Sequence, residues 1–260
     1  MNPDKALSLT GKVVVITGGV SGIGAGIAVR FLSAGATVVA CSRRKPANLP
    51  CYESRTLEYF ECDVRKAESC QLFVESVFER HGRLDALINN AGGSLEMDSA
   101  TALPNVIENI IQLNLIGAFF MSQAAHRVMT RQNSGGSIIN ICSVSAIRAS
   151  PYTAAYGAAK AGLVNLTETL AMEWGPQNIR VNALIVGLIA TQNSLDHYGG
   201  KAGVERISAM LPLQRMGTPL DVANACLFLC SSLADYVSGA KIAVHGGGEK
   251  PIFLDLARDK

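Results

Sequence analysis

Tyr156 and Lys160 are the residues of this chain whose types and spacing best suit acid/base chemistry. They lie four residues apart in an alanine-rich segment that continues as Ala-Gly-Leu-Val-Asn-Leu. The continuation predicts a helix, on which a four-residue spacing places both side chains on one face. An ammonium group beside a phenol favours the phenolate and should lower the pKa of Tyr156 from about 10 toward the catalytic range. Because many helices carry a Tyr and a Lys at this spacing, the pair needs support from elsewhere in the chain.

Length and composition predict one α/β domain over residues 1–260. The chain is 48% hydrophobic and rich in glycine, and it carries a formal net charge of only +2, which argues against nucleic-acid binding. No apolar run is long enough to cross a membrane and the first residues show no signal-peptide pattern, so we expect a cytoplasmic protein. The seven cysteines form no CxxC motif and the four histidines are scattered, so we expect no metal site.

A glycine-rich loop after the first predicted strand indicates a nucleotide site. Residues 12–17 form a β-branched run, and the loop that follows leads into a segment of helical periodicity. Glycines let the backbone approach a pyrophosphate, and the helix start offers free N–H groups. A tight turn alone would also use glycines. The candidate cofactor residues in this loop are Gly18, Val20, Ser21, Gly22, Ile23 and Gly24.

The second predicted strand, 36–41, bears on the choice of coenzyme. It ends in Ser42-Arg43-Arg44, about where an acidic residue would bind the ribose 2′-hydroxyl of NAD. Ser42 and Arg43 could bind a 2′-phosphate instead, so NADP(H) is favoured. NAD(H) stays possible, because two arginines at a strand end could simply be solvated.

Further strands are predicted at 56–61, 84–88, 137–142, 179–185 and 241–245, alternating with helices. This alternation predicts a Rossmann-type, doubly wound parallel sheet of about seven strands with helices on both faces. Asp63, after the third strand, could contact adenine or cap the next helix. Asn114 interrupts an apolar helix around 107–122, where it could bind an ordered water or hydrogen-bond across to another strand. Residues 192–213 look irregular, and a segment at about 188–213 is a candidate substrate lid.

These pieces together resemble the classical short-chain dehydrogenase/reductase family over essentially the whole chain. Ser143 precedes Tyr156 by thirteen residues, which is the family's usual spacing. Two departures stand out: Val186 replaces a common proline before Gly187, and Ser21 replaces the basic residue of many NADP(H)-preferring relatives. The matching positions are Thr17, Gly18, Gly22, Ile23, Gly24, Asp63, Val64, Asn89, Asn90, Ala91, Gly92, Asn114, Ser143, Tyr156, Lys160, Arg180, Asn182, Gly187 and Thr191.

The resemblance implies roles for four residues. Tyr156 would be the general acid in carbonyl reduction and the base in alcohol oxidation, and Lys160 would lower its pKa and hold the ribose hydroxyls. Ser143 would hydrogen-bond the substrate oxygen, and Asn114 would position a water that relays protons to Lys160. It also implies a homo-oligomer, a tetramer with a dimer as the second possibility. Further cofactor contacts would come from Ser42, Arg43, Arg44, Cys62, Asp63, Val64, Asn90, Ala91, Gly92, Tyr156, Lys160, Val186, Gly187, Ile189 and Thr191.

We therefore expect an oxidoreductase that transfers a hydride between NADP(H) and a ketone or secondary alcohol. Apolar residues near the lid, including Leu195, Met210 and Leu211, suggest an apolar substrate of the 3-oxoacyl, steroid or cyclic ketone type, unless they pack the lid on itself. The alternatives are an NAD(H)-dependent alcohol dehydrogenase, an enzyme acting on C=C bonds or performing dehydration, and a non-catalytic nucleotide sensor. The candidate substrate contacts are Ser143, Ser145, Tyr156, Leu188 and Tyr198.

Overall fold

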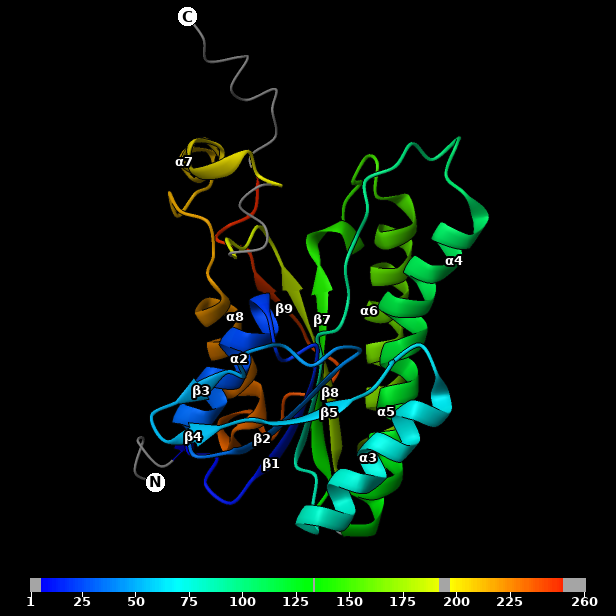
Figure 1. Ribbon diagram of the computed structural model, residues 1–260, viewed down its shortest axis with the longest axis vertical. Coiled ribbons are helices and arrows are strands. Elements are labelled where there is room, and N and C mark those ends of the chain that lie inside the picture. Colours follow the sequence, from blue (N-terminus) through cyan, green and yellow to red (C-terminus); the bar gives the residue numbers. More distant parts are fainter. Residues whose placement is uncertain (1–5, 133, 192–196, 250–260) are drawn as a thin grey trace, which may run out of the picture.

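A parallel β-sheet forms the centre of the protein. The computed structural model describes residues 6–132, 134–191 and 197–249, and within these ranges the sheet has seven strands in the order β5-β2-β1-β6-β7-β8-β9 (Figure 1). All neighbouring strands of this sheet run parallel. The predicted doubly wound α/β class is therefore confirmed. The strands are β1 (Val13–Thr17), β2 (Thr37–Ser42), β5 (Glu58–Glu61), β6 (Ala86–Asn89), β7 (Gly136–Ser143), β8 (Ile179–Val186) and β9 (Lys241–Val244).

Helices cover both faces of the sheet (Figure 1). On one face α2 (Gly22–Ser33) and α8 (Pro219–Cys230) pack on the side chains of Val14 and Ile16. On the other face α3 (Ala67–His81), α5 (Gly117–Met129) and α6 (Ala154–Trp174) pack on Val13 and Val15. Successive side chains of β1 point to opposite faces of the sheet, because a strand has a period of two residues. Since both faces are buried, apolar side chains are required along the whole run.

Three local features differ from the sequence-based expectations. Residues 200–210, expected to be irregular, form α7 (Gly200–Met210), which begins after a left-handed Gly199. Two glycines in its first turn hide the helical pattern. The expected continuous helix around Asn114 divides into α4 (Pro104–Ile111), a π-helical turn (Gln112–Ile116) and α5. A short antiparallel pair, β3 (Cys51–Tyr52) and β4 (Arg55–Thr56), was not expected.

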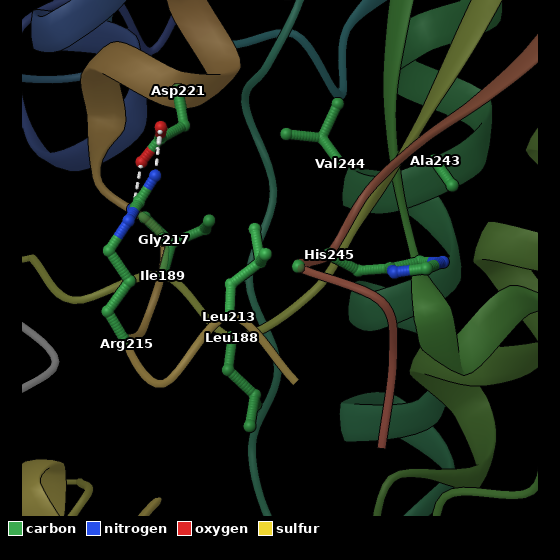
Figure 2. A pocket seen from close by; sticks show the side chains of 10 residues that line it. Leu188, Ile189, Leu213, Arg215, Gly217, Asp221, Ala243, Val244 and His245 are labelled. Carbon is green, nitrogen blue, oxygen red and sulfur yellow. Dashed lines mark hydrogen bonds and ion pairs between the residues drawn. The ribbon is translucent and has the colours of Figure 1, made fainter. Parts of the chain in front are cut away.

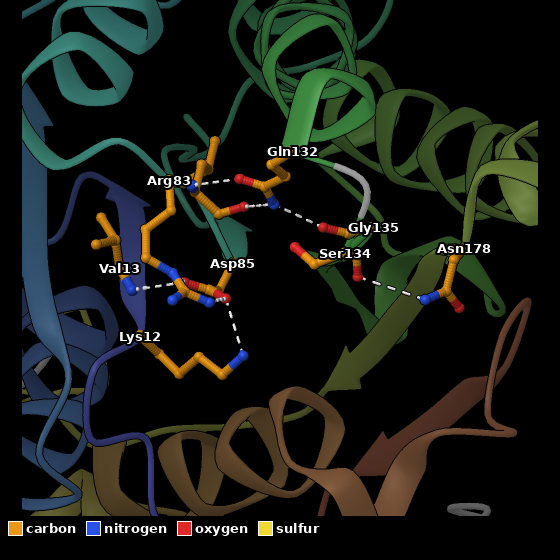
Figure 3. Close-up of polar contacts among 9 residues, drawn as sticks. Lys12, Val13, Arg83, Asp85, Gln132, Ser134, Gly135 and Asn178 are labelled. Atoms are coloured by element: carbon orange, nitrogen blue, oxygen red, sulfur yellow. Dashed lines mark hydrogen bonds and ion pairs between the residues drawn. The ribbon is translucent and has the colours of Figure 1, made fainter.

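A polar network joins the amino-terminal ends of β1, β6 and β7 (Figure 3). The carboxylate of Asp85 accepts hydrogen bonds from the Val13 amide (2.9 Å), the Lys12 ammonium (3.0 Å) and the Arg83 guanidinium (2.7 and 2.6 Å). The Gln132 side chain accepts a hydrogen bond from the Leu84 amide and donates one to the Leu84 carbonyl. The network fixes the register of these strands at their amino-terminal ends, and the site is predicted at the opposite end of the sheet.

Asp85 should make stability depend on pH. Burial opposes its ionisation, but the Arg83, Val13 and Lys12 hydrogen bonds outweigh burial and hold its pKa below the ordinary value. The ionised form thus stabilises the fold above the unfolded pKa of about 4, and this contribution is lost as the pH falls through the folded pKa. We expect Asp85→Asn to lower the free energy of unfolding by about 1–3 kcal/mol at pH 7. Denaturant titration at pH 7 and pH 3 should show the difference from wild type shrinking in acid.

Glu79→Gln, which removes an exposed carboxylate of α3, is the matched control and should change stability little. A difference between Asp85→Asn and wild type that stays constant over this pH range would contradict the role of the ionised carboxylate.

Candidate active site

Tyr156 and Lys160 lie where the sequence places them, on successive turns of α6. Lys160 is 3% exposed and its Nζ donates a 2.8 Å hydrogen bond to the Ile141 carbonyl of β7. The same Nζ lies 5.7 Å from the centre of the Tyr156 ring. The ammonium group is thus held beneath the phenol by the strand rather than by another side chain.

In the protein without a ligand, burial outweighs any lowering of the Tyr156 pKa by Lys160. Burial raises the pKa of Tyr156, and the neighbouring Ser143 hydroxyl opposes this rise without cancelling it. Burial also lowers the pKa of Lys160. The physical reason is that both groups lose solvation, while the ammonium group is hydrogen-bonded to the Ile141 carbonyl. A lower phenol pKa would therefore need charge or hydrogen bonds from a ligand.

Ser143 ends β7 beside Tyr156. Its side chain is 9% exposed, and its Oγ accepts a 3.2 Å hydrogen bond from the Ser145 amide. Its effect on the pKa of Tyr156 places the two hydroxyls close together. The hydroxyls of Ser143 and Tyr156 can thus act on one substrate oxygen.

Asn114 occupies the π-helical turn and is 1% exposed. Its Nδ2 donates to the carbonyls of Gly93 (2.8 Å) and Ile110 (3.0 Å), and its Oδ1 accepts from the Gly93 amide (3.0 Å). The expected hydrogen bond to another strand is not what the structure shows, because the partners are Gly93 in the loop after β6 and Ile110 in α4. A Cβ at Gly92 would lie 2.6 Å from this Oδ1 and 3.3 Å from Lys160 Nζ. Asn114 Oδ1 and Lys160 Nζ therefore face one small space, which is open because Gly92 has no side chain. A water or a ligand hydroxyl could hydrogen-bond to both atoms there.

The glycine loop suits a pyrophosphate. No side chain caps the first turn of α2, so its N–H groups are available, and Gly18 and Gly22 have φ values of +65° and +51°. A Cβ at Gly24 would overlap the Gly18 carbonyl. The Asn90 side chain donates to the carbonyls of Thr17 (2.9 Å) and Gly18 (3.2 Å), which fixes the loop to the end of β6. These features fit a dinucleotide held by residues 18–24, including Val20, Ser21 and Ile23.

The neighbouring ends of β2 and β5 bring Ser42, Arg43 and Asp63 to the same edge of the sheet. Arg43 is exposed, and its charge contributes to lowering the pKa of Asp63. Asp63 is bound mainly by Arg65, whose guanidinium donates to it at 2.7 and 2.9 Å. The alternative that Asp63 caps the next helix is wrong, because α3 begins after Lys66 without a side-chain cap.

The segment after β8 is held against the end of β9, Gly217 and the glycine loop. The Gly187 amide donates to the Val244 carbonyl (3.0 Å), Ile189 pairs with Gly217, and Thr191 faces Gly22. Behind this segment is a cavity of about 230 Å³ (Figure 2). Its lining residues are Leu188, Ile189, Leu213, Arg215, Gly217, Asp221, Ala243, Val244, His245 and Gly246.

Two features of this region were missed by the sequence analysis. Arg215 and Asp221 form a two-bond ion pair of 2.7 and 2.8 Å on the cavity wall, six residues apart in the chain. The ring of His245 points away from this pair (Figure 2), and its Nδ1 is buried without a hydrogen-bond partner within the described chain. Only the position of His245 just after the last strand could have drawn attention to it.

The lid residues are only partly where we expected them. Tyr198 is half-buried, and its charge would influence the pKa of Tyr156. By contrast, Leu211 is 4% exposed and packed within the protein, whereas Met210 is 64% exposed. Leu195 lies outside the described residues. Of the three apolar side chains expected in this pocket the structure describes only Met210 and Leu211, and one of them is exposed while the other is buried.

Within the described ranges, no helix is long and apolar enough to cross a membrane, and no group of three or more His, Cys, Asp or Glu side chains could hold a metal ion.

Comparison with known proteins agrees with this geometry. A family model described as enoyl-(acyl carrier protein) reductase matches residues 5–249. An NAD-dependent glycerol dehydrogenase from Listeria innocua is 36% identical, covering 94% of this chain and 96% of the relative. The 2-dehydro-3-deoxy-D-gluconate 5-dehydrogenase of Escherichia coli is 34% identical, covering 93% and 97%.

Solved structures agree as well. A provisionally assigned NAD(P)-dependent gluconate 5-dehydrogenase from Beutenbergia cavernae, crystallised with NADP at low occupancy, has a TM-score of 0.85 and 31% identity. The match covers 93% of this chain and 98% of that one. The chain belongs to the short-chain dehydrogenase/reductase family and is an NAD(P)-dependent oxidoreductase acting on CH–OH groups.

Proposed function

We propose that this protein is a ketoreductase or secondary-alcohol dehydrogenase that transfers a hydride between NADP(H) and its substrate, with Tyr156 as the acid/base group. The observation that carries the proposal is that Ser143, Tyr156 and Lys160 lie together at the end of the sheet that also holds the glycine loop. This is the carboxyl end of the strands, where ligands of doubly wound sheets bind.

The chain's own residues have distinct tasks in this proposal. In the reductive direction Tyr156 donates a proton to the substrate oxygen, which Ser143 orients through its hydroxyl. Lys160, fixed by Ile141, holds the ribose hydroxyls, and Asn114 with Lys160 holds a water in the space beside Gly92. The nicotinamide, when bound, supplies the hydride.

NADP(H) is the proposed coenzyme because Ser42 and the exposed Arg43 stand at the end of β2 without an acidic neighbour on that strand end. A guanidinium suits a phosphate through paired hydrogen bonds. NAD(H) is the alternative, and the name of the Listeria relative favours it.

The substrate contacts we propose are Ser143, Ser145, Tyr156, Leu188 and Tyr198. The apolar substrate expected from the sequence has little support, because Leu211 is buried in the protein and Met210 faces outward. The relatives' names instead refer to glycerol and a sugar acid. Reduction of an enoyl thioester is a second candidate, favoured by the description of the family model.

We further propose a cytoplasmic homotetramer. The outer face of α6 leaves Ala154, Ala158, Ala161 and Met172 exposed, as would suit close packing against another copy of the chain. Sedimentation equilibrium tests this with a mass of four chains as the expected value, and a single-chain mass would contradict it.

Replacement of Tyr156 by Phe removes the proton donor but keeps the ring. We expect kcat/KM for reduction of a panel of ketones to fall by at least about a hundredfold, while the affinity for NADPH, measured by fluorescence, changes little. Tyr236→Phe, at a fully exposed tyrosine, is the matched control. Full activity of Tyr156→Phe would show that the proposed mechanism is incorrect.

Replacement of Arg43 by Ala tests the coenzyme. Loss of a charged hydrogen bond to the 2′-phosphate should weaken NADPH binding by about tenfold to a hundredfold and leave NADH binding nearly unchanged. Lys45→Ala removes the same charge two residues away and should have a much smaller effect. Equal or better turnover of the wild type with NADH would overturn the NADP(H) proposal.

A further inference from the structure

A chain of buried hydrogen bonds joins α5 and α6 through two strands of the sheet. Asn89 on β6 donates from Nδ2 to the Ser122 hydroxyl of α5 (2.9 Å) and to Asn140 Oδ1 on β7 (2.8 Å). Asn140 Nδ2 donates to the Thr167 hydroxyl of α6 (2.8 Å), which itself donates to the Leu163 carbonyl one turn earlier (2.7 Å). Asn140 and Thr167 are both 0% exposed. Solvent therefore cannot replace either partner of the hydrogen bond between them.

Asn140 has a fixed orientation in this chain of hydrogen bonds. Its amide oxygen is bonded to Asn89 and its amide nitrogen to Thr167, and exchanging the two atoms would place a donor against the donor of Asn89. A buried amide with both ends bonded favours one arrangement of its surroundings over all others. The apolar contacts of α6 at Leu163 and Leu170 lack this directionality. The hydrogen bond therefore sets where α6 lies along β7.

The same helix carries Lys160, seven residues before Thr167. Seven residues are two turns of a helix, so both side chains lie on the face of α6 that packs on the sheet. Lys160 Nζ donates to the Ile141 carbonyl at 2.8 Å, and Ile141 directly follows Asn140 in the strand. α6 is thus joined to two consecutive residues of β7, and one of the two bonds involves the ammonium group of the candidate site. A shift of the helix that breaks the Asn140 bond would also move Nζ away from its carbonyl partner.

We propose that Asn140 and Thr167 are positioning residues for Lys160. Their hydrogen bond sets the placement of α6 on β7 and thereby holds Nζ at the Ile141 carbonyl, facing the space beside Gly92. The buried ammonium group has little solvent to compensate for a displacement, and a displacement of about 1 Å can slow an enzyme about a hundredfold. The inference rests on the proposed function and adds to it two fully buried residues that act only through Lys160.

Thr167→Val tests the inference, because it removes the hydroxyl and keeps the branched shape. The phenol pKa of Tyr156, followed by NMR of 13Cζ-labelled tyrosine in the NADP⁺ complex, should rise by at least about 0.5 unit relative to wild type, since the ammonium group is displaced. The kcat for the most rapidly reduced of cyclohexanone, butan-2-one and dihydroxyacetone should fall by about tenfold. Thr167→Ser restores the hydroxyl, and its phenol pKa should lie within about 0.2 unit of wild type.

Ser137→Ala is the matched control. It removes another buried hydroxyl from β7, at the amino-terminal end, where Ser137 donates to the Leu229 carbonyl (3.2 Å). This variant should lower the thermal midpoint, as Thr167→Val does, and leave the phenol pKa and kcat at the wild-type values. Thr167→Ala removes the hydroxyl with a smaller side chain and provides the same test if Thr167→Val does not fold.

Three results would overturn the inference: a wild-type phenol pKa in folded Thr167→Val, an equal rise of that pKa in Ser137→Ala, or failure of Thr167→Ser to recover it. Failure of the proposed function is seen separately, as retained turnover in Tyr156→Phe. The two failures are distinguishable, because the phenol pKa is measured without any substrate.

Discussion

The burial of Lys160 is the constraint on which the rest of the site depends. An ammonium group that is 3% exposed loses most of its hydration, and its one hydrogen bond within the described chain goes to the Ile141 carbonyl. The surroundings of Nζ must therefore leave room for further polar partners. The absence of a side chain at Gly92 provides that room, and Asn114 borders it with a carbonyl oxygen held in place by Gly93. The π-helical turn follows from the same need, because it brings Asn114 against the Gly93 backbone.

The two ends of the sheet have different roles: one end fixes the strands, and the other carries the candidate site. At the amino-terminal end, Asp85 and Gln132 join the strands and fix their register. At the carboxyl end, Asn90 bonds the end of β1 and the glycine loop, and the neighbouring loops carry Ser143 and Gly187. A register fixed at one end permits close polar placement at the other, because parallel strands keep their alignment along their length.

The sequence predicts the features that depend on short-range pattern. The β-branched runs, the glycine loop after β1 and the spacing of Tyr156 and Lys160 all follow from periods of two or 3.6 residues. The features that it cannot predict depend on contacts between distant segments. Burial raises the pKa of Tyr156, and the Asp63 carboxylate is bound by the Arg65 guanidinium. Leu211 is buried in the protein, although its hydrophobicity suits a substrate pocket. The π-helical turn has only one signal in the sequence, an asparagine in an apolar run.

Tyr156 and Lys160 should become an acid/base pair when a coenzyme adds its charge and hydroxyl groups to the buried site. The direct measurement is an NMR titration of 13Cζ-labelled tyrosine, with Tyr156 assigned by the Tyr156→Phe variant, with and without NADP⁺. The phenol pKa should lie above about 10 in the protein alone and fall by at least about one unit when NADP⁺ is bound. A pKa already below about 10 without coenzyme, or one that NADP⁺ leaves unchanged, would contradict the account.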